Sequence, residues 1–130
     1  MTQRVLIVDD EDSARMSVEL ALTMAGYSVV GTADGREAIQ QIIAADDQSR
    51  EFDLLITDLK MPNMSGMELL DELNAMGVSI PTLVITGFAD NQTIKQLSEK
   101  GCNDYYEKPL DPKTLTDRVG EILKKMGAIA

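Results

Sequence analysis

The chain has 130 residues, 44% of them hydrophobic, so it is long enough to bury the core of one domain and too short for two. Its formal net charge of −10 argues against direct binding to nucleic acid or to an anionic membrane, because both require a basic surface. The sequence contains no histidine, which excludes Ser-His-Asp catalysis, Cys-His catalysis and histidine-ligated zinc. Carboxylates, hydroxyls and lysines must therefore supply the chemistry.

The apolar run nearest the N-terminus, Val5 to Val8, is too short for a signal peptide or a membrane span, and acidic residues follow it directly. Cys102 is the only cysteine, which excludes an internal disulfide and is typical of a small buried thiol in a reducing compartment. We assign Cys102 no role. We expect a single domain over residues 1–130, located in the cytoplasm.

Five short apolar runs alternate with five amphipathic segments along the chain. The runs, which predict strands, lie at Arg4–Val8, Tyr27–Thr32, Leu54–Asp58, Thr82–Ile85 and Cys102–Tyr106. The alternation predicts an α/β fold: a parallel sheet with right-handed crossovers and helices on both faces. The simplest such fold is the flavodoxin-like sheet with strand order 2-1-3-4-5.

The apolar stripes of the helical segments predict which residues face the core. Asp12 or Ser13 is expected to cap the first helix, Gly35 to open the second, and Gly66 to precede the third. The residues expected to face inward are Met16, Leu20 and Met24, flanked by Ala14, Val18 and Ala21; Ala38, Ile39, Ile42 and Ile43; Leu69, Leu70, Leu73 and Met76; Ile94 and Leu97; and Leu115, Val119, Ile122, Leu123 and Met126. The helix over Asp90–Lys100 has the fewest strong apolar residues and should be the least firmly anchored.

Three carboxylates are expected to meet where the first and third strands end side by side, at the edge where open α/β sheets bind ligands. Asp9 and Asp10 follow the first strand, and Asp58 ends the third. Two carboxylates about 4 Å apart repel by about 4 kcal/mol at an effective dielectric of about 20, so the cluster implies a cation. Oxygen ligands without histidine favour Mg²⁺ or Mn²⁺, with a loop carbonyl and waters completing the octahedron.

A phosphoryl group is the ligand that the neighbouring residues favour. The fourth strand ends in Thr86 and Lys108 follows the fifth, so the metal, a hydroxyl and an ammonium could each take one phosphoryl oxygen. In-line attack by Asp58 would then give an acyl phosphate. Taken singly, Thr86 is equally well an ordinary turn hydroxyl and Lys108 an ordinary surface lysine. Acidic residues at strand ends can also be simple helix caps, which we prefer for Asp12, Asp34 and Asp90.

These features resemble the receiver domain of two-component response regulators, over residues 5–126. The resemblance is carried by Val8-Asp9-Asp10, Ala33-Asp34-Gly35-Arg36-Glu37-Ala38, Asp58–Gly66, Thr86-Gly87, and Gly101–Tyr105 with Lys108-Pro109. Each motif is weak alone, but their order and spacing together are specific.

The resemblance implies that Asp58 accepts a phosphoryl group from a sensor histidine kinase or a histidine phosphotransfer protein. Asp10 and Asp58 would bind Mg²⁺ directly, Asp9 would act largely through water, and the backbone carbonyl of Lys60 would complete the protein ligands. The chain would then be no enzyme in the usual sense, because it would catalyse only its own phosphotransfer and dephosphorylation.

The resemblance also implies a switch. Thr86 and Lys108 would hold the phosphoryl group, and Tyr105 would be the aromatic that responds to Thr86, although on its own Tyr105 is more typical of a half-buried packing residue. The face made by the Asp90–Lys100 helix, the fifth strand and the last helix would change shape and signal to a downstream output protein or domain. A phosphorylation-dependent dimer is compatible with this reading.

Other functions compete with the receiver reading. Leu6–Asp12 also resembles the nucleophile motif of haloacid-dehalogenase-type phosphohydrolases, with Asp10 as nucleophile and Asp12 as general acid, but that reading leaves the Asp58 segment unexplained. A docking module that works without phosphorylation would not need the intact set of Asp10, Asp58, Thr86 and Lys108. Flavin binding is disfavoured, because Asp9 and Asp10 would repel the phosphate and few aromatic residues are present.

Overall fold

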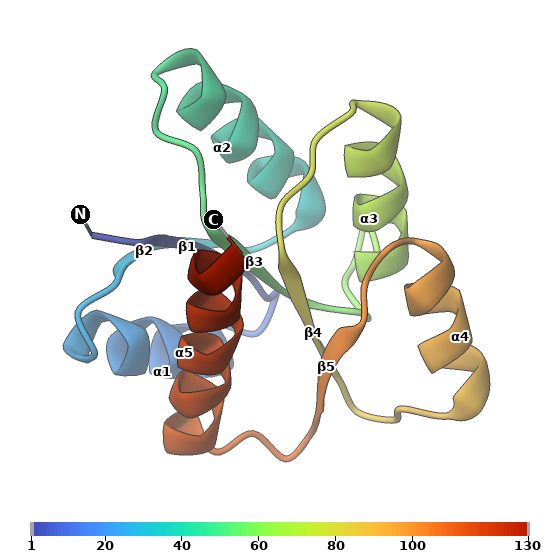
Figure 1. The fold of residues 1–130 in the computed structure, drawn as a ribbon. Helices are drawn as coiled ribbons and strands as arrows, with labels where there is room; N and C mark the ends of the chain where they lie inside the picture. Colours follow the sequence, from blue (N-terminus) through green and yellow to red (C-terminus); the bar gives the residue numbers. More distant parts are fainter. Residues whose placement is uncertain (1, 130) are drawn as a thin grey trace.

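A parallel five-stranded sheet forms the centre of the computed structural model, which describes residues 2–129, with side chains described for residues 2–125 (Figure 1). The strands are β1 (Arg4–Val8), β2 (Ser28–Thr32), β3 (Leu54–Asp58), β4 (Thr82–Thr86) and β5 (Asp104–Glu107). Their order is β2-β1-β3-β4-β5, with every neighbouring pair parallel. The predicted flavodoxin-like order is therefore confirmed.

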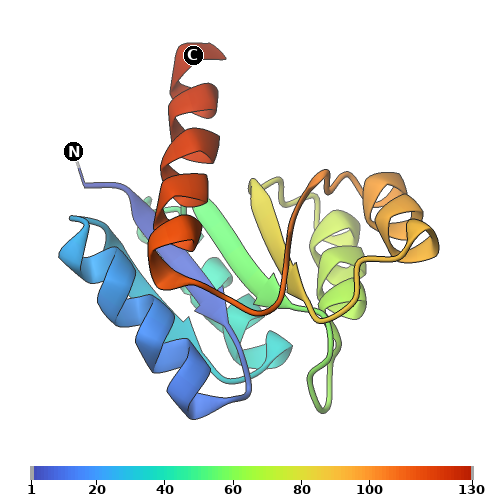
Figure 2. The ribbon, with the colours of Figure 1, turned by 90° about the horizontal axis from the view of Figure 1, so that it is seen from below.

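Helices cover both faces of this sheet, as the βαβ alternation requires. They are α1 (Asp12–Met24), α2 (Gly35–Asp47), α3 (Gly66–Ala75), α4 (Asn91–Glu99) and α5 (Pro112–Ile129). One face carries α1 and α5 and the other carries α2, α3 and α4, an arrangement that can also be followed in the view from below (Figure 2). No helix within residues 2–129 combines the length and apolar character that a bilayer crossing needs.

The strand residues are buried on both sides because each face has its own helix layer. Alternate residues of β1 divide between the two cores: Val5 and Ile7 pack with α1 and α5, whereas Leu6 and Val8 pack with α2 and α3. All residues of β3 are buried, including Asp58 at its end. Burial of β3 fixes the backbone that presents this carboxylate.

The helix caps predicted from the sequence are confirmed for α2 and α4 but not for α1. Asp34 caps α2 through a hydrogen bond from the Glu37 N–H at 2.9 Å, and Asp90 caps α4 through the Thr93 N–H at 2.8 Å. The expected cap of α1 is wrong: Asp12 is already the first helical residue. The N-cap is Glu11, whose side chain makes no capping hydrogen bond.

The predicted centre of the buried face of α1 is also wrong, although Val18, predicted at its flank, is buried and Ala14 and Ala21 are half-buried. Met16, Leu20 and Met24 are 62%, 62% and 79% exposed, whereas Val18 and Leu22 are buried. Both sets repeat every four residues and lie on different sides of the helix, so spacing alone could not choose between them. Met16, Leu20 and Met24 therefore face outward, and Val18 and Leu22 meet β1 and α5.

Ile43 and Met76, at the far ends of their predicted stripes, are also exposed, at 45% and 39%. Most of the other residues predicted to face inward from α2, α3 and α5 are buried, including Ala38, Leu69 and Leu115. The side chain of Met126 lies outside the described residues.

Cys102 is buried, as expected for a lone cysteine, and desolvation raises the pKa of its thiol to about 11. At about pH 8 we expect the native protein to react with a thiol reagent about a hundredfold more slowly than the unfolded chain, because the thiolate fraction is that much lower. Reaction with Ellman's reagent with and without denaturant measures this ratio. Equal rates in the two states would contradict the burial of the thiol.

Candidate functional site

The predicted acidic cluster is present at the carboxyl edge of the sheet. Pairing of Val8 with Thr57 brings the ends of β1 and β3 together. Asp9, Asp10 and Asp58 each place a carboxylate oxygen within 4.8 Å of the others. Asp58 is the buried member, at 7% exposure, and Asp10 is the exposed one. The cluster is thus partly open to solvent.

Backbone contacts hold Asp58 in place. The Lys60 N–H donates to Asp58 Oδ1 at 3.3 Å, and the buried Thr57 hydroxyl donates to the Asp58 carbonyl at 2.9 Å. Gly66, the first residue of α3, donates its N–H to the Leu59 carbonyl at 2.9 Å, which ties the start of α3 to the end of β3. The loop that starts at Lys60 is therefore closed at both ends on the backbone around Asp58.

Lys108 supplies the positive charge of the site. Its Nζ lies 2.7 Å from Asp58 Oδ2. The backbone N–H of Lys108 donates to the Thr86 carbonyl at 2.8 Å, which extends the pairing of β4 with β5. The hydrogen bond to Asp58 raises the pKa of Lys108, with further support from the charges of Asp58, Asp9 and Glu11. Lys108 is therefore a charged partner of Asp58 and not a free surface lysine.

The Asp9 carboxyl shows the electrostatic cost of the cluster. Burial raises its pKa most, and the charges of Asp58 and Asp10 raise it further, while the Glu11 N–H and Lys108 oppose them. A raised carboxyl pKa means that ionised Asp9 costs folding free energy above that pKa, and that the cost fades as the pH falls through it. A bound cation would remove this cost at neutral pH.

Thr86 has two roles in this structure. Its hydroxyl donates to the Phe88 carbonyl at 3.2 Å and accepts from the Phe88 N–H at 3.3 Å, so it is a turn hydroxyl. It also lines an open crevice of about 910 Å³ with Asp9, Asp58 and Lys108. The functional and the ordinary interpretations of Thr86 are therefore compatible.

Tyr105 is not part of the crevice. Its half-buried side chain packs against the cluster that contains Val84, Leu97 and Cys102, and its carbonyl accepts a hydrogen bond from Arg118 Nη2 at 3.2 Å. β5 pairs Tyr105 with Val84, two residues before Thr86. The structure therefore places Tyr105 on β5 against residues of β4 and α4, and outside the set that lines the crevice.

Two residues that support the site had no role in the sequence interpretation. Arg15 donates to the Asp9 carbonyl at 2.8 Å and pairs with Asp12 at 2.7 Å, so it braces the loop between β1 and α1. Glu107 accepts the Ala89 N–H at 2.8 Å and holds the loop after β4. The i, i+3 spacing of Asp12 and Arg15 was the only available signal. This pairing also occupies Asp12, which the phosphohydrolase reading would need as a general acid.

The donor set fits an oxygen-ligated divalent cation. Asp9, Asp10 and Asp58 could contribute carboxylate oxygens, and neither histidine nor a nearby thiolate is present to favour a softer metal. Lys108 contacts only Asp58 among the three carboxylates. Three clustered negative charges with one ammonium leave a net charge that a divalent cation would neutralise.

The fold and this site together define a doubly wound α/β domain with an acidic site at its topological switch point. Comparison with known families is consistent with that class: the model of the response regulator receiver domain matches residues 5–120. The chain belongs to the receiver domain family of response regulators.

Relatives of known sequence and structure agree. The chain is 31% identical over 126 residues to the alkaline phosphatase synthesis transcriptional regulatory protein PhoP of Bacillus subtilis, covering 96% of this chain and 50% of PhoP. It is 35% identical over 115 residues to the transcriptional regulatory protein FixJ of Rhizobium meliloti, covering 88% of this chain and 54% of FixJ. The chain thus spans about half the length of these curated relatives.

Among solved structures, the chain is similar to a CheY-like response regulator receiver domain protein from Methanospirillum hungatei, with a TM-score of 0.87, 27% identity and coverage of 100% of both chains. It is also similar to the chemotaxis protein CheY4 of Vibrio cholerae, with a TM-score of 0.82 and 31% identity, covering 94% of this chain and 99% of the other. Both similarities extend over nearly the whole chain.

Proposed function

We propose that this receiver domain accepts a phosphoryl group on Asp58 from the phosphohistidine of a sensor histidine kinase or a histidine phosphotransfer protein. The observation that carries the proposal is the position of Asp58: it is buried in the carboxylate cluster, has Lys108 Nζ at 2.7 Å, and lines the same crevice as Thr86. A carboxylate oxygen of Asp58 would form the new P–O bond as the P–N bond breaks, and the electron pair would return to the donor's imidazole.

Each neighbouring residue has a separate part in this proposal. Asp10, Asp58 and the Lys60 carbonyl would bind Mg²⁺, or Mn²⁺ in its place, with Asp9 acting through water. The bound metal would offset the carboxylate charge and polarise the phosphoryl oxygens. Lys108 would exchange its contact with the Asp58 carboxylate for one with a phosphoryl oxygen, and the Thr86 hydroxyl would leave its turn to donate to another.

Phosphorylation would be read out on the face formed by α4, β5 and α5. When Thr86 turns toward the phosphoryl group, the space it leaves would let Tyr105 move inward, and this face would change shape. A downstream output protein or domain would respond to the changed face, and phosphorylation-dependent dimerisation would be one form of output. The same Tyr105 rotamer in free and phosphorylated protein would rule this switch out.

The test is the intact mass of the protein after incubation with Mg²⁺ and acetyl phosphate. We expect one phosphoryl adduct that requires Mg²⁺, is labile in base, and is absent from Asp58→Asn. Asp47→Asn, which removes an exposed carboxylate at the end of α2, is the matched control and should be phosphorylated normally.

Failure of both acetyl phosphate and a phosphorylated histidine kinase to modify Asp58 would favour a docking module that works without phosphorylation. Steady release of phosphate from a small phosphoester, lost in Asp10→Asn and retained in Asp58→Asn, would instead favour the phosphohydrolase.

The exposed apolar stripe of α1, formed by Met16, Leu20 and Met24, is proposed as the contact for the phosphodonor protein. α1 begins two residues after Asp10, so this helix starts beside the crevice that a donor must reach. We expect Leu20→Lys to slow transfer from a histidine kinase that phosphorylates the chain by about tenfold or more. Phosphorylation by acetyl phosphate should be unchanged, and a loss with both donors would contradict the docking role.

A further inference from the structure

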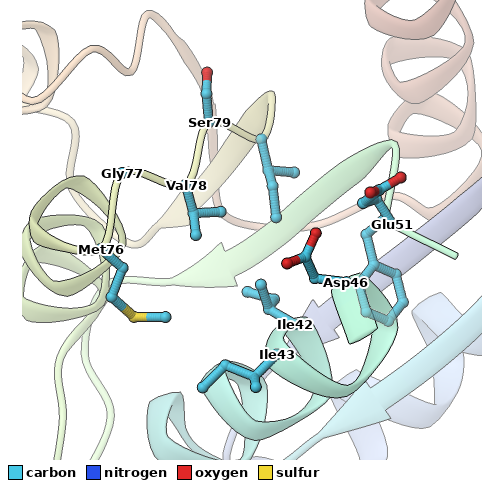
Figure 3. A pocket seen from close by; sticks show the side chains of 10 residues that line it. Ile42, Ile43, Asp46, Glu51, Met76, Gly77, Val78 and Ser79 are labelled. Atoms are coloured by element: carbon cyan, nitrogen blue, oxygen red, sulfur yellow. The ribbon is translucent and has the colours of Figure 1, made fainter. Parts of the chain in front are cut away.

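A cavity of about 420 Å³ opens at the edge of the sheet opposite Asp58, and the phosphoryl chemistry makes no use of it. Its lining comes from the second half of α2, from residues 76–80 after α3, and from the two residues before Asp53 (Figure 3). Its volume lies within the range of small-ligand sites. The cavity therefore deserves a functional explanation separate from that of the acidic cluster.

The floor and sides of the cavity are apolar. Ile42 and Phe52 are buried members of the core between the sheet and α2, so they form a firm floor. Val78 is partly buried against the same core, while Ile43 and Met76 flank the opening and are exposed. Methionine adapts to ligands of different shape, and an apolar group that entered the cavity would cover these exposed side chains.

One end of the cavity is acidic. Figure 3 shows the carboxylates of Asp46 and Glu51 at the end away from Met76. No lysine or arginine lines the cavity, and the ion pairs found within the described residues involve neither carboxylate. The nearby Arg4 stacks on the Phe52 ring, and its side chain donates to the Arg50 carbonyl and not to either carboxylate. The cavity thus offers two negative charges beside an apolar floor.

We propose that this cavity binds a small organic cation, an amine or guanidine attached to an aromatic or branched aliphatic group. The apolar part would contact Phe52 and Met76, and the cationic part would lie between Asp46 and Glu51. The two carboxylates would repel an anion, and a neutral apolar molecule would gain burial alone. The limited volume suits a small molecule better than an extended protein segment.

Phenethylamine is a suitable probe, because it joins one aromatic ring to one primary amine. Titration would follow the methyl resonances of isoleucine, valine and methionine, with Mg²⁺ present to occupy the acidic cluster around Asp58. We expect saturable shifts of Ile42, Ile43, Met76 and Val78 at millimolar concentrations. Phenethyl alcohol and hydrocinnamate have a similar ring and chain, but the first is neutral and the second is an anion. Both should bind at least about fivefold more weakly than phenethylamine.

The double variant Asp46→Asn/Glu51→Gln should lower the affinity for phenethylamine about fivefold or more. The control Asp47→Asn removes an exposed carboxylate that does not line the cavity, and should leave this affinity unchanged. Equal binding of the three probes, or shifts confined to the Asp58 edge, would overturn the proposal. A capped phenylalanyl-lysine amide that binds at least about tenfold more tightly than phenethylamine would overturn it in favour of a partner's peptide segment. None of these outcomes depends on phosphorylation of Asp58.

Discussion

Replacing Gly66 with alanine is expected to lower the free energy of unfolding by about 2–3 kcal/mol, a large effect for a single methyl group. A Cβ at this position would lie 2.3 Å from the Asp58 carbonyl oxygen and 2.9 Å from the Leu59 Cα. Both are backbone atoms, so no side-chain rotation can relieve the overlap. The start of α3 must move away from β3, which would also break the hydrogen bond from the Gly66 N–H to the Leu59 carbonyl.

The same displacement should reach the site. The Asp58 carboxylate is attached to the backbone that would shift, so a displacement of the Asp58 carbonyl also moves the carboxylate relative to Lys108 and Asp10. We therefore expect phosphorylation of Gly66→Ala by acetyl phosphate to be slowed at temperatures where the variant is still fully folded. A normal rate in the folded variant would mean that the loop absorbs the methyl group without moving Asp58.

Gly120→Ala is the matched control and should have the opposite sign. A Cβ there would lie 3.7 Å from the Tyr27 hydroxyl, an ordinary contact, and the position is within α5. Alanine is favoured over glycine in a helix, so stability should rise by about 0.5–1 kcal/mol. Urea denaturation of both variants measures the difference, and a common sign would contradict the close approach assigned to Gly66.

The site was largely predictable because a parallel sheet converts positions in the sequence into neighbours in space. Every strand of such a sheet ends at the same edge, so the residues that follow strand ends converge there whatever their loops do. Asp9, Asp10, Asp58, Thr86 and Lys108 were placed by this rule alone, and all of them line one crevice. Their assignment to metal and phosphoryl binding remains our proposal.

The features that the sequence did not predict are those for which two arrangements of the side chains fit the sequence pattern about equally well, or for which no pattern exists. α1 carries two apolar stripes, and only packing against the sheet and α5 makes Val18, predicted at the flank, and the unpredicted Leu22 the buried centre in place of Met16 and Leu20. Arg15 and Glu107 act through loop backbones whose path no periodicity encodes. The cavity floored by Phe52 forms where three chain segments end, and the ends of elements are the least predictable positions.

Replacing Lys108 with alanine is expected to lower the stability of the metal-free protein by about 1–2 kcal/mol. The Asp58 side chain is only 9% exposed and would be left in the acidic cluster without its ammonium partner. The Lys108 side chain is 39% exposed, so solvent screening keeps the loss below that of a fully buried pair. Lys95→Ala, which removes an exposed lysine of α4, should have little effect.

The pH dependence of this loss follows from the raised pKa of Lys108. A lysine with a higher pKa in the folded state stabilises that state fully below its ordinary pKa, and this contribution disappears as the pH rises through the folded-state value. The difference between the protein and Lys108→Ala should therefore be constant from about pH 7 to about pH 9 and shrink only above about pH 10.5. Urea denaturation in the presence of EDTA at several pH values measures it.

Magnesium should reverse the stability defect of Lys108→Ala without restoring phosphorylation. Lys108 and a divalent cation would both offset the negative charge at Asp58, so removal of the ammonium should raise the apparent Mg²⁺ affinity by about threefold to tenfold. Saturating Mg²⁺ should bring the unfolding free energies of the protein and the variant closer together. Phosphorylation should remain slow, because Mg²⁺ cannot replace the hydrogen bond that we propose from Lys108 to a phosphoryl oxygen. A variant that is rescued in both properties would show that Lys108 acts only by its charge on Asp58.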